Sequence, residues 1–337
     1  MHLKIDGSIH EGGGSILRVA VPIAAALGNS IEVTNIRANR KKPGLRLQHL
    51  LGLQIIRDIT RGELTGGEVG SQQITFTPLD HIQIPLNVKV ETAASIPLII
   101  QTLLNYVVAG GYPIDITFEG GGTHTRWAPT MEYLEHVTAP TLRLFGITLE
   151  MVVKKFGFYP RGGASVRVSL SKLEPSSPVV IKERMADDDR PRLFVCVSKS
   201  LESKRIPERI HEIVSKKLEV DLLPLYKEGF PGVAATLVLP GLPSLGYSVI
   251  GERKLSSETL GKMLLEQVTD DTNHMDEYLS DQLLVALAFS PLGSELIVHN
   301  TPHVLANLHV IENTLGNVLS VEEEGAFLRI YRIQDKK

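Results

Sequence analysis

The sequence is poor in several residue types, and each shortage excludes a class of protein. Cys196 is the only cysteine among the 337 residues, so no disulfide can form within the chain. It lies in the apolar run LFVCV, which predicts a buried strand position rather than a nucleophile. Aromatic residues make up 5% of the chain and the formal net charge is -3, which disfavours a stacking platform for single-stranded nucleic acid and a long basic footprint.

Anchoring segments and several catalytic motifs are absent as well. No apolar run reaches the length of a membrane span, and no charged segment followed by an apolar one opens the chain. The motifs HExxH, paired CxxC, GxxxxGKS/T and GxSxG do not occur, so zinc hydrolysis, Walker-type ATP hydrolysis and a hydrolase elbow are unsupported. We expect a cytoplasmic protein without a membrane partner.

What the sequence does contain is one order of elements that recurs three times. Residues 14–79, 94–171 and 276–333 each predict a helix, a strand, a loop, a second helix and one or two further strands. Alternating apolar strands and amphipathic helices are typical of sheets with helices packed on one face. The apolar content of 43% is enough for a large core. We therefore predict an α/β (α+β) fold with three repeated units.

A segment that does not repeat this order of elements separates the second unit from the third. It starts after the Pro/Ser-rich LEPSSP and includes the predicted strands VVIKE, RLFVCVS, VAATLVLP and YSVIGER with two helices. We interpret residues 176–272 as a small inserted α/β domain, in which no residue has an evident catalytic role. Residues 1–175 and 273–337 then form the large domain.

The start of a helix in residues 298–316, VHNTPHVLANLHVIENTLG, is the first candidate site. Thr301 can cap this helix and Pro302 suits its first turn. His303 then lies where backbone N–H groups and the helix dipole favour a phosphate, and Asn307 is one turn further on. A surface histidine beside a cap is the alternative interpretation.

A glycine run, EGGGS at residues 11–15, joins the opening strand to the first helix. It is either a tight turn or a place where the backbone approaches an anion. Glu11 would repel a phosphate unless a divalent cation, Mg²⁺ or Mn²⁺, lay between them. Arg18 lies on the following helix and can add a charge-assisted contact.

A basic loop follows the first predicted strand of the first unit. Pro43 and Gly44 define its turn, and Gln48 and His49 follow on the next helix. A solvated loop is the simplest interpretation, although fixed arginines also suit a terminal phosphate. If the three units superpose, residues 37–44, 120–124 and 300–303 occupy equivalent positions. The basic residues of the loop are Arg37, Arg40, Lys41, Lys42 and Arg46.

Several of these segments together resemble the RNA 3'-terminal phosphate cyclase family. The resemblance covers nearly the whole chain, least clearly the insert, and implies a large domain of three α/β units with a smaller inserted one. The loop GGTHTRWAP departs from commoner family forms at residues 124–127, so the details of a nucleotide pocket are not carried over there. The matching motifs are IDGSIHEGGGSILR, IRANRKKPGLRLQH, GFYPRGG, EYLSDQL and PHVLANLHVIE.

The resemblance implies ATP-dependent conversion of an RNA 3'-phosphate to a 2',3'-cyclic phosphodiester through a histidine–AMP intermediate, with release of AMP and pyrophosphate. His303 stands at the position of the adenylylated histidine. Arg18, Arg37 and Arg40 match phosphate-binding arginines, and Arg18 and Arg40 are expected to be catalytic. Glu11 matches a carboxylate near the divalent metal, and Gln101 matches its polar partner. The implied partners are ATP and an RNA with a 3'-phosphate end, and a homo-oligomer is left open.

The nucleotide-binding positions follow from the same resemblance. Tyr278 and Pro129 match the residues that sandwich adenine, and Asp281 and Gln282 follow in YLSDQ. The other polar positions carried over are Arg37, Gln48, His49 and Gln101.

Three alternatives remain open from the sequence. A non-catalytic branch of the same family acts in ribosomal RNA processing but lacks the histidine, so the presence of His303 with Glu11 and Arg18 argues against it. An enolpyruvyl transferase has a related repeated fold, but it would need a second large domain and would not need the KPGLxxQH segment. A plain RNA-binding module is disfavoured by the low aromatic content and the acidic balance.

Overall fold

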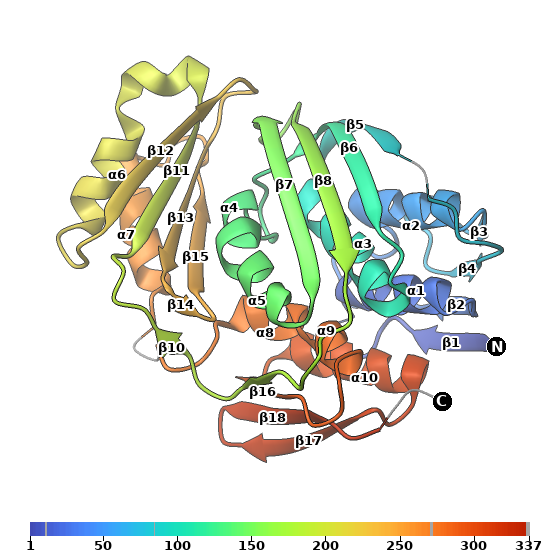
Figure 1. The fold of residues 1–337 in the computed structure, drawn as a ribbon. Coiled ribbons are helices and arrows are strands. Elements are labelled where there is room, and N and C mark those ends of the chain that lie inside the picture. Colours follow the sequence, from blue (N-terminus) through green and yellow to red (C-terminus); the bar gives the residue numbers. More distant parts are fainter. Residues whose placement is uncertain (11, 84, 270–271, 335–337) are drawn as a thin grey trace.

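Three four-stranded sheets share one order of strands (Figure 1). The computed structural model describes residues 1–10, 12–83, 85–269 and 272–334. In each sheet the first strand runs parallel to the second, and the fourth lies between the second and the third, antiparallel to both. The first sheet consists of β1 (His2–Asp6), β2 (Ser30–Thr34), β3 (Glu63–Thr65) and β4 (Ile74–Thr77). The second consists of β5 (Leu86–Ser95), β6 (Ile114–Gly122), β7 (Ile147–Lys155) and β8 (Ser165–Lys172). The third consists of β9 (Val180–Ile181), β16 (Glu295–His299), β17 (Leu319–Glu324) and β18 (Phe327–Arg332).

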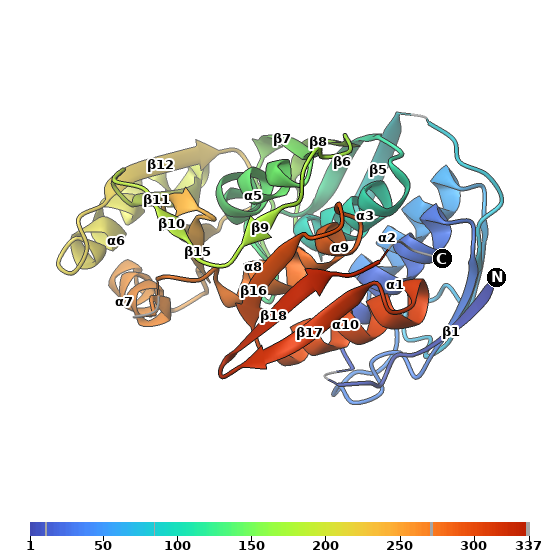
Figure 2. The ribbon, with the colours of Figure 1, turned by 60° about the horizontal axis from the view of Figure 1, so that its bottom comes forward.

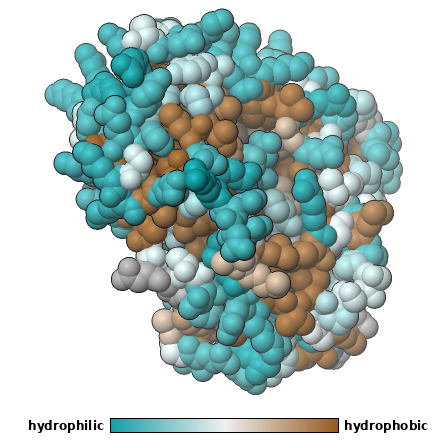
Figure 3. Space-filling model, turned by 60° about the vertical axis from the view of Figure 1, so that its left-hand side comes forward, coloured by the Kyte–Doolittle hydropathy of each residue, from teal (hydrophilic) through white to brown (hydrophobic). Residues whose placement is uncertain are grey.

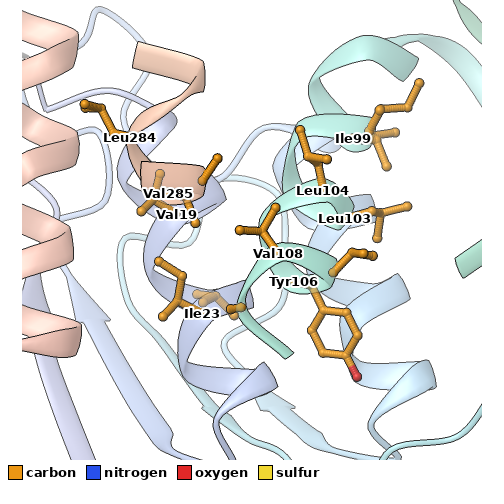
Figure 4. Packing of buried hydrophobic residues seen from close by; sticks show 14 of the residues in the cluster. Val19, Ile23, Ile99, Leu103, Leu104, Tyr106, Val108, Leu284 and Val285 are labelled. Atoms are coloured by element: carbon orange, nitrogen blue, oxygen red, sulfur yellow. The ribbon is translucent and has the colours of Figure 1, made fainter. Parts of the chain in front are cut away.

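Helices fill the space between these sheets and form one core. Helix α1 packs against α2, α3 and α10, and α3 also packs against α9. Side chains of α1, α3 and α9 meet in the close view of Figure 4. Each Leu, Ile or Val that is fully buried there stabilises the fold by roughly 1.5–3 kcal/mol relative to an exposed one. The helices are α1 (Ser15–Ala26), α2 (Leu47–Ile59), α3 (Ile96–Gly110), α8 (Glu277–Gln282), α9 (Leu284–Ala288) and α10 (Pro302–Leu315).

The predicted second helix of the middle unit is interrupted by a wider turn. Helix α4 (Met131–Tyr133) continues through a π-helical turn, Leu134–Thr138, into α5 (Ala139–Leu144). Pro140 explains the change of pitch, because its ring has no N–H and would collide with the carbonyl four residues earlier in a regular α-helix. The wider turn lets the chain keep its direction, so the helix is not broken.

The inserted segment has its own sheet and its own core on the left of Figure 1. Its strand order is β12-β11-β13-β15, with α6 and α7 packed on it. A backbone hydrogen bond of 2.6 Å from Arg184 N–H to the Asn273 carbonyl joins the two ends of the segment. Hydrophobic surface on this side of the molecule is interspersed with hydrophilic side chains (Figure 3). The elements are β11 (Arg192–Ser198), α6 (Ile206–Val214), β12 (Asp221–Lys227), β13 (Val233–Leu239), β15 (Leu245–Ile250), α7 (Ser257–Gln267), a 3-10 turn (Lys199–Lys204) and the short pair β10 (Met185–Ala186) and β14 (Gly241–Leu242).

One strand was placed wrongly by sequence reasoning. The run VVIKE was assigned to the insert, but β9 pairs in parallel with β16, in the third large sheet. Only two residues form the strand, and its partner follows more than a hundred residues later, so no local pattern identifies the sheet to which it belongs. The insert therefore interrupts the third unit after its first strand.

The predicted α/β (α+β) class is confirmed, because the described residues form four four-stranded mixed sheets with helices packed against them. The division into domains at residues 175 and 273 stays a prediction. Within the part of the chain that the structure describes, no helix is long and apolar enough to span a membrane.

Candidate active site

A cavity of about 580 Å³ lies where the insert meets the large helices. Its walls come from α1, α3, the loop after β6, α8, α10, and from β15 and α7 of the insert. Elements that are far apart in sequence thus converge on one space. Seven of the predicted site residues line it: Arg18, Gln101, Pro129, Tyr278, Asp281, Gln282 and His303.

The start of α10 is formed as its sequence predicts. The Thr301 hydroxyl accepts a 3.2 Å hydrogen bond from the Val304 N–H, and Pro302 is the first helical residue. His303 is exposed and faces the cavity, near the positive end of the helix dipole. Asn307 is buried, and its amide donates to the Asp281 carbonyl at 3.3 Å. The helix start therefore presents the histidine to the cavity while Asn307 connects α10 to α8.

Asp276 is a positioning residue that sequence reasoning missed. Its carboxylate caps α8 by accepting from the N–H groups of Tyr278 and Leu279 at 3.0 and 2.9 Å. It also accepts from the Tyr133 hydroxyl at 2.6 Å and from the Gly246 N–H of the insert at 3.0 Å. Burial raises the pKa of Asp276 above its usual value, although these donors partly offset the effect. One carboxylate thus links α8, α4 and the insert beside the cavity.

Helix α8 is held in place by a second set of bonds. The Gln282 amide oxygen accepts from the Thr138 hydroxyl at 3.1 Å, and its amide nitrogen donates to the Tyr278 carbonyl at 2.7 Å. Tyr278 itself is 60% exposed, so its ring projects from a fixed backbone into the space of the cavity. A planar ligand can therefore stack on it without a rearrangement of the helix.

The loop after β6, which departs from commoner family forms, is anchored by a buried pair. His124 Nε2 lies 2.7 Å from the Glu132 carboxylate, and His124 Nδ1 lies 2.8 Å from the Thr123 hydroxyl. Burial opposes ionisation of Glu132, but its bonds with His124 and with the thiol of Cys196 lower the pKa to about 2. Cys196 is buried on β11, as predicted. The anchor fixes the residues that follow, up to Pro129 at the cavity wall.

The basic loop is closed by hydrogen bonds of its own side chains. The Arg37 guanidinium donates to the carbonyls of Lys42 and Gly44 at 2.9 and 3.1 Å. Asn39 donates to the Ser8 carbonyl at 2.9 Å, which joins the basic loop to the turn after β1. Arg37 therefore holds the loop closed, a structural contribution that the sequence did not predict.

His49 is buried on α2 and contacts the end of this loop. Its Nδ1 accepts from the Arg46 N–H at 3.3 Å, so the ring is neutral with its proton on Nε2. Burial, followed by the charges of Arg18, Arg37 and Arg46, lowers the pKa of His49 to about 3. A Cβ atom on Gly14 would lie 2.1 Å from His49 Nε2, so this position needs glycine.

The remaining predicted residues lie beside the cavity or outside the described part. Arg40 is exposed on the basic loop, and Gln48 is half-buried in the first turn of α2. Arg37 and His49 belong to the same cluster, next to Arg18. Glu11 lies outside the described residues. The geometry therefore brings together a cavity and an adjacent basic cluster that meet at Arg18.

The insert supplies a wall of the cavity that the sequence did not indicate. Ser248 and Ile250 of β15 and Met263 and Gln267 of α7 line it. Glu252 also lines it and forms an ion pair with Arg126. These residues belong to no common sequence motif. The sequence predicted only the strand and the helix that carry most of them. Only the docking of the insert against α8 gives them a common site.

Comparison with known proteins gives one consistent result. A family model described as RNA 3'-terminal phosphate cyclase matches residues 9–321. A Thermococcus kodakarensis protein named RNA 3'-terminal phosphate cyclase is 32% identical, over 96% of this chain and 95% of its own length. Proteins of the same name from Methanosarcina barkeri and Drosophila melanogaster are each 30% identical, over 96% of this chain and 98% and 93% of their lengths. The resemblance inferred from the motifs is confirmed.

Proposed function

Because the chain belongs to the RNA 3'-terminal phosphate cyclase family, we propose that it is an enzyme that uses ATP to convert an RNA 3'-terminal phosphate to a 2',3'-cyclic phosphodiester. The observation that carries this proposal is the convergence of His303, Arg18 and Gln101, from three different helices, on one cavity. A nucleophile, a cation and a polar oxygen donor are what nucleotidyl transfer requires.

The cavity suits ATP in size and in polarity. Its volume of about 580 Å³ falls in the usual range for small-molecule sites, roughly 300–1,000 Å³. Arg18 and His303 provide a polar end for phosphates, and Leu98, Pro129 and Tyr278 provide surfaces for a base. Tyr278 and Pro129 are the proposed partners on the two faces of the adenine.

In the first step, His303 is the nucleophile. Its neutral imidazole attacks the α-phosphorus of ATP, a P–N bond forms, and the bond to pyrophosphate breaks. A neutral imidazole has a lone pair on one ring nitrogen, which can attack phosphorus. Arg18 stabilises negative charge on the phosphates as the pyrophosphate leaves. The N-terminal turn of α10 adds backbone N–H groups in the same place.

A divalent metal fits the donor set. Mg²⁺ and Mn²⁺ take oxygen ligands and are commonly held by one or two protein oxygens together with substrate phosphates. Gln101, whose side chain carries an amide oxygen, lines the cavity that Arg18 and His303 share, and Glu11 is the other proposed ligand. Such an ion would neutralise phosphate charge during the transfer.

In the second step, AMP moves from His303 to the RNA 3'-phosphate. The P–N bond breaks, a phosphoanhydride forms at the RNA end, and the histidine returns to its neutral form. The 2'-hydroxyl of the same ribose then attacks the terminal phosphorus and AMP leaves, which gives the cyclic phosphodiester. Proximity within one ribose favours this closure, and DNA ends cannot react because they lack the hydroxyl.

The basic loop is the proposed site for the RNA 3'-phosphate. Arg40 is exposed on this loop. A guanidinium can hold two phosphate oxygens at once. Arg40→Ala should leave adenylylation by ATP nearly intact and slow the transfer of AMP to RNA, and Arg40→Lys should rescue it poorly. Normal discharge of isolated protein–AMP by the Ala variant would place the RNA phosphate elsewhere.

The decisive experiment is incubation with α-labelled ATP and a divalent metal. We expect a protein–AMP adduct that is labile in acid and stable in alkali, and none with His303→Ala. His309→Ala is the matched control on the same helix and should retain the adduct. The absence of an adduct with the wild type would favour the non-catalytic branch of the family, and label on His303→Ala would exclude His303 as the nucleophile.

A further inference from the structure

The cavity has two chemically different ends. In both ribbon views α8 lies between the insert on one side and α1 and α10 on the other (Figures 1 and 2). Arg18 and His303 line the cavity from α1 and α10, and Gln267 and Met263 line it from α7 of the insert. At the insert end, the positive charge of Arg126 is paired with Glu252. Phosphates therefore belong at the end of Arg18 and His303.

This polarity orients a nucleoside triphosphate. When its α-phosphate lies at His303, the base points away from Arg18 and toward the insert. There, Val249, Ile250 and Met263 provide apolar contacts, and Gln267 is a polar group at the wall. The edge of the purine farthest from the ribose carries the substituent at position 6, which is an amino group in adenine and a carbonyl oxygen in hypoxanthine and guanine.

The amide of Gln267 is oriented by the insert itself. Its Nε2 donates to the Ser248 carbonyl at 3.1 Å. A carbonyl oxygen only accepts, so the nitrogen must face Ser248 and the amide oxygen Oε1 must point the other way. Among the residues that the structure describes, none donates a hydrogen bond to this oxygen. The protein thus holds a half-buried acceptor of fixed direction in the wall of the cavity.

We infer that Gln267 determines the specificity for ATP by accepting a hydrogen bond from the 6-amino group of adenine. The inference rests on the proposed function, which supplies the orientation of the nucleotide. A 6-carbonyl oxygen in the same place would face the lone pairs of Oε1, so the amide would repel ITP and GTP. The amide cannot rotate to present its N–H groups without losing its bond to Ser248. The insert, which contributes no residue to the transfer chemistry, would then select the nucleotide.

The test compares ATP with ITP, in which a 6-carbonyl group replaces the 6-amino group and N1 carries a proton. Dissociation constants are measured by calorimetry in the His303→Ala background, where no adduct can form. We expect ATP to bind at least about tenfold more tightly than ITP, and Gln267→Met to reduce this ratio to about one by weakening ATP binding. Glu266→Met, on the neighbouring exposed residue, should keep the original ratio.

Two results would overturn the inference. The first is a Gln267→Met protein that keeps the ATP preference. The second is a variant in which ATP and ITP binding fall by the same factor together with the melting temperature, which would make Gln267 a structural residue. The labelling experiment on the wild type is read separately, because it reports on His303 and not on the base. A labelled wild type with an unchanged ratio in Gln267→Met would therefore refute only the role of Gln267.

Discussion

His49 should make the stability of this protein sensitive to mild acid, and the size of the effect follows from its environment. Its pKa is lowered to about 3 in the folded chain, first by burial and then by three arginines, whereas an unfolded histidine has a pKa of about 6.5. The unfolded chain therefore takes up a proton below that value and the folded chain does not. The stabilising contribution is complete above pH ~6.5 and is lost as the pH falls toward about 3.

Each pH unit in this window costs about 1.4 kcal/mol of unfolding free energy for a single group. Between pH 7 and pH 4.5, His49 should thus account for a loss of about 2.5 kcal/mol. His49→Gln removes the titrating group and keeps an amide oxygen that can accept from the Arg46 N–H. The variant should therefore lose about 2.5 kcal/mol less than the wild type over the same range.

Urea unfolding at a series of pH values measures the difference directly. Other groups titrate in both proteins and cancel in the comparison. His2→Gln is the control, because His2 is an exposed histidine on β1, and this variant should follow the wild type. NMR of histidine ring nitrogens should also show a neutral His49 with Nε2 protonated at pH 5. An equal loss of stability in His49→Gln and in the wild type would show that the buried ring is not neutral in the folded protein.

Three further substitutions test the supports of the site. Asp276→Ala should destabilise the protein by roughly 3 kcal/mol in urea unfolding, because the Tyr133 hydroxyl and the Gly246 N–H lose their acceptor; Asp276→Asn, which keeps one acceptor oxygen, should cost less, and equal costs would contradict the bond assignment. Thr301→Ala should cost about 1 kcal/mol through loss of the α10 cap, and Thr301→Ser should restore most of it; no difference between the two would mean that the cap contributes nothing. Gly14→Ala should cost roughly 2 kcal/mol because the buried His49 ring must move, and an unchanged unfolding curve would show that the contact relaxes freely.

Features set by neighbouring residues could be predicted from the sequence. Thr301 and Pro302 act on the turn that they begin, so the start of α10 is where their order predicts. The alternating apolar residues of β2 and β18 are buried on one face, as the period of a strand requires. The fold class follows from the succession of such elements, and it is confirmed for that reason.

Features that depend on distant partners could not be predicted. Asp276 has the local signature of a helix cap, but its bonds to Tyr133 and Gly246 exist only once three elements have packed together. Gln267 ends an ordinary amphipathic helix, and nothing in its neighbourhood indicates a cavity. The positive charge of the basic loop could be predicted from the sequence. The bonds by which Arg37 closes the turn could not, because the direction of the accepting carbonyls is set by the folded backbone.

The place of the insert has a consequence for how the chain folds. The third sheet cannot close until β16 has been synthesised, because the partner of β9, which ends at Ile181, begins at Glu295. An insert that folds first brings its two ends together, as the bond between Arg184 and Asn273 shows. The entropy of closing a loop grows with its length, so this folding lowers the barrier to pairing β9 with β16. Destabilising the insert alone should therefore slow the folding of the third sheet, although no residue of that sheet is changed.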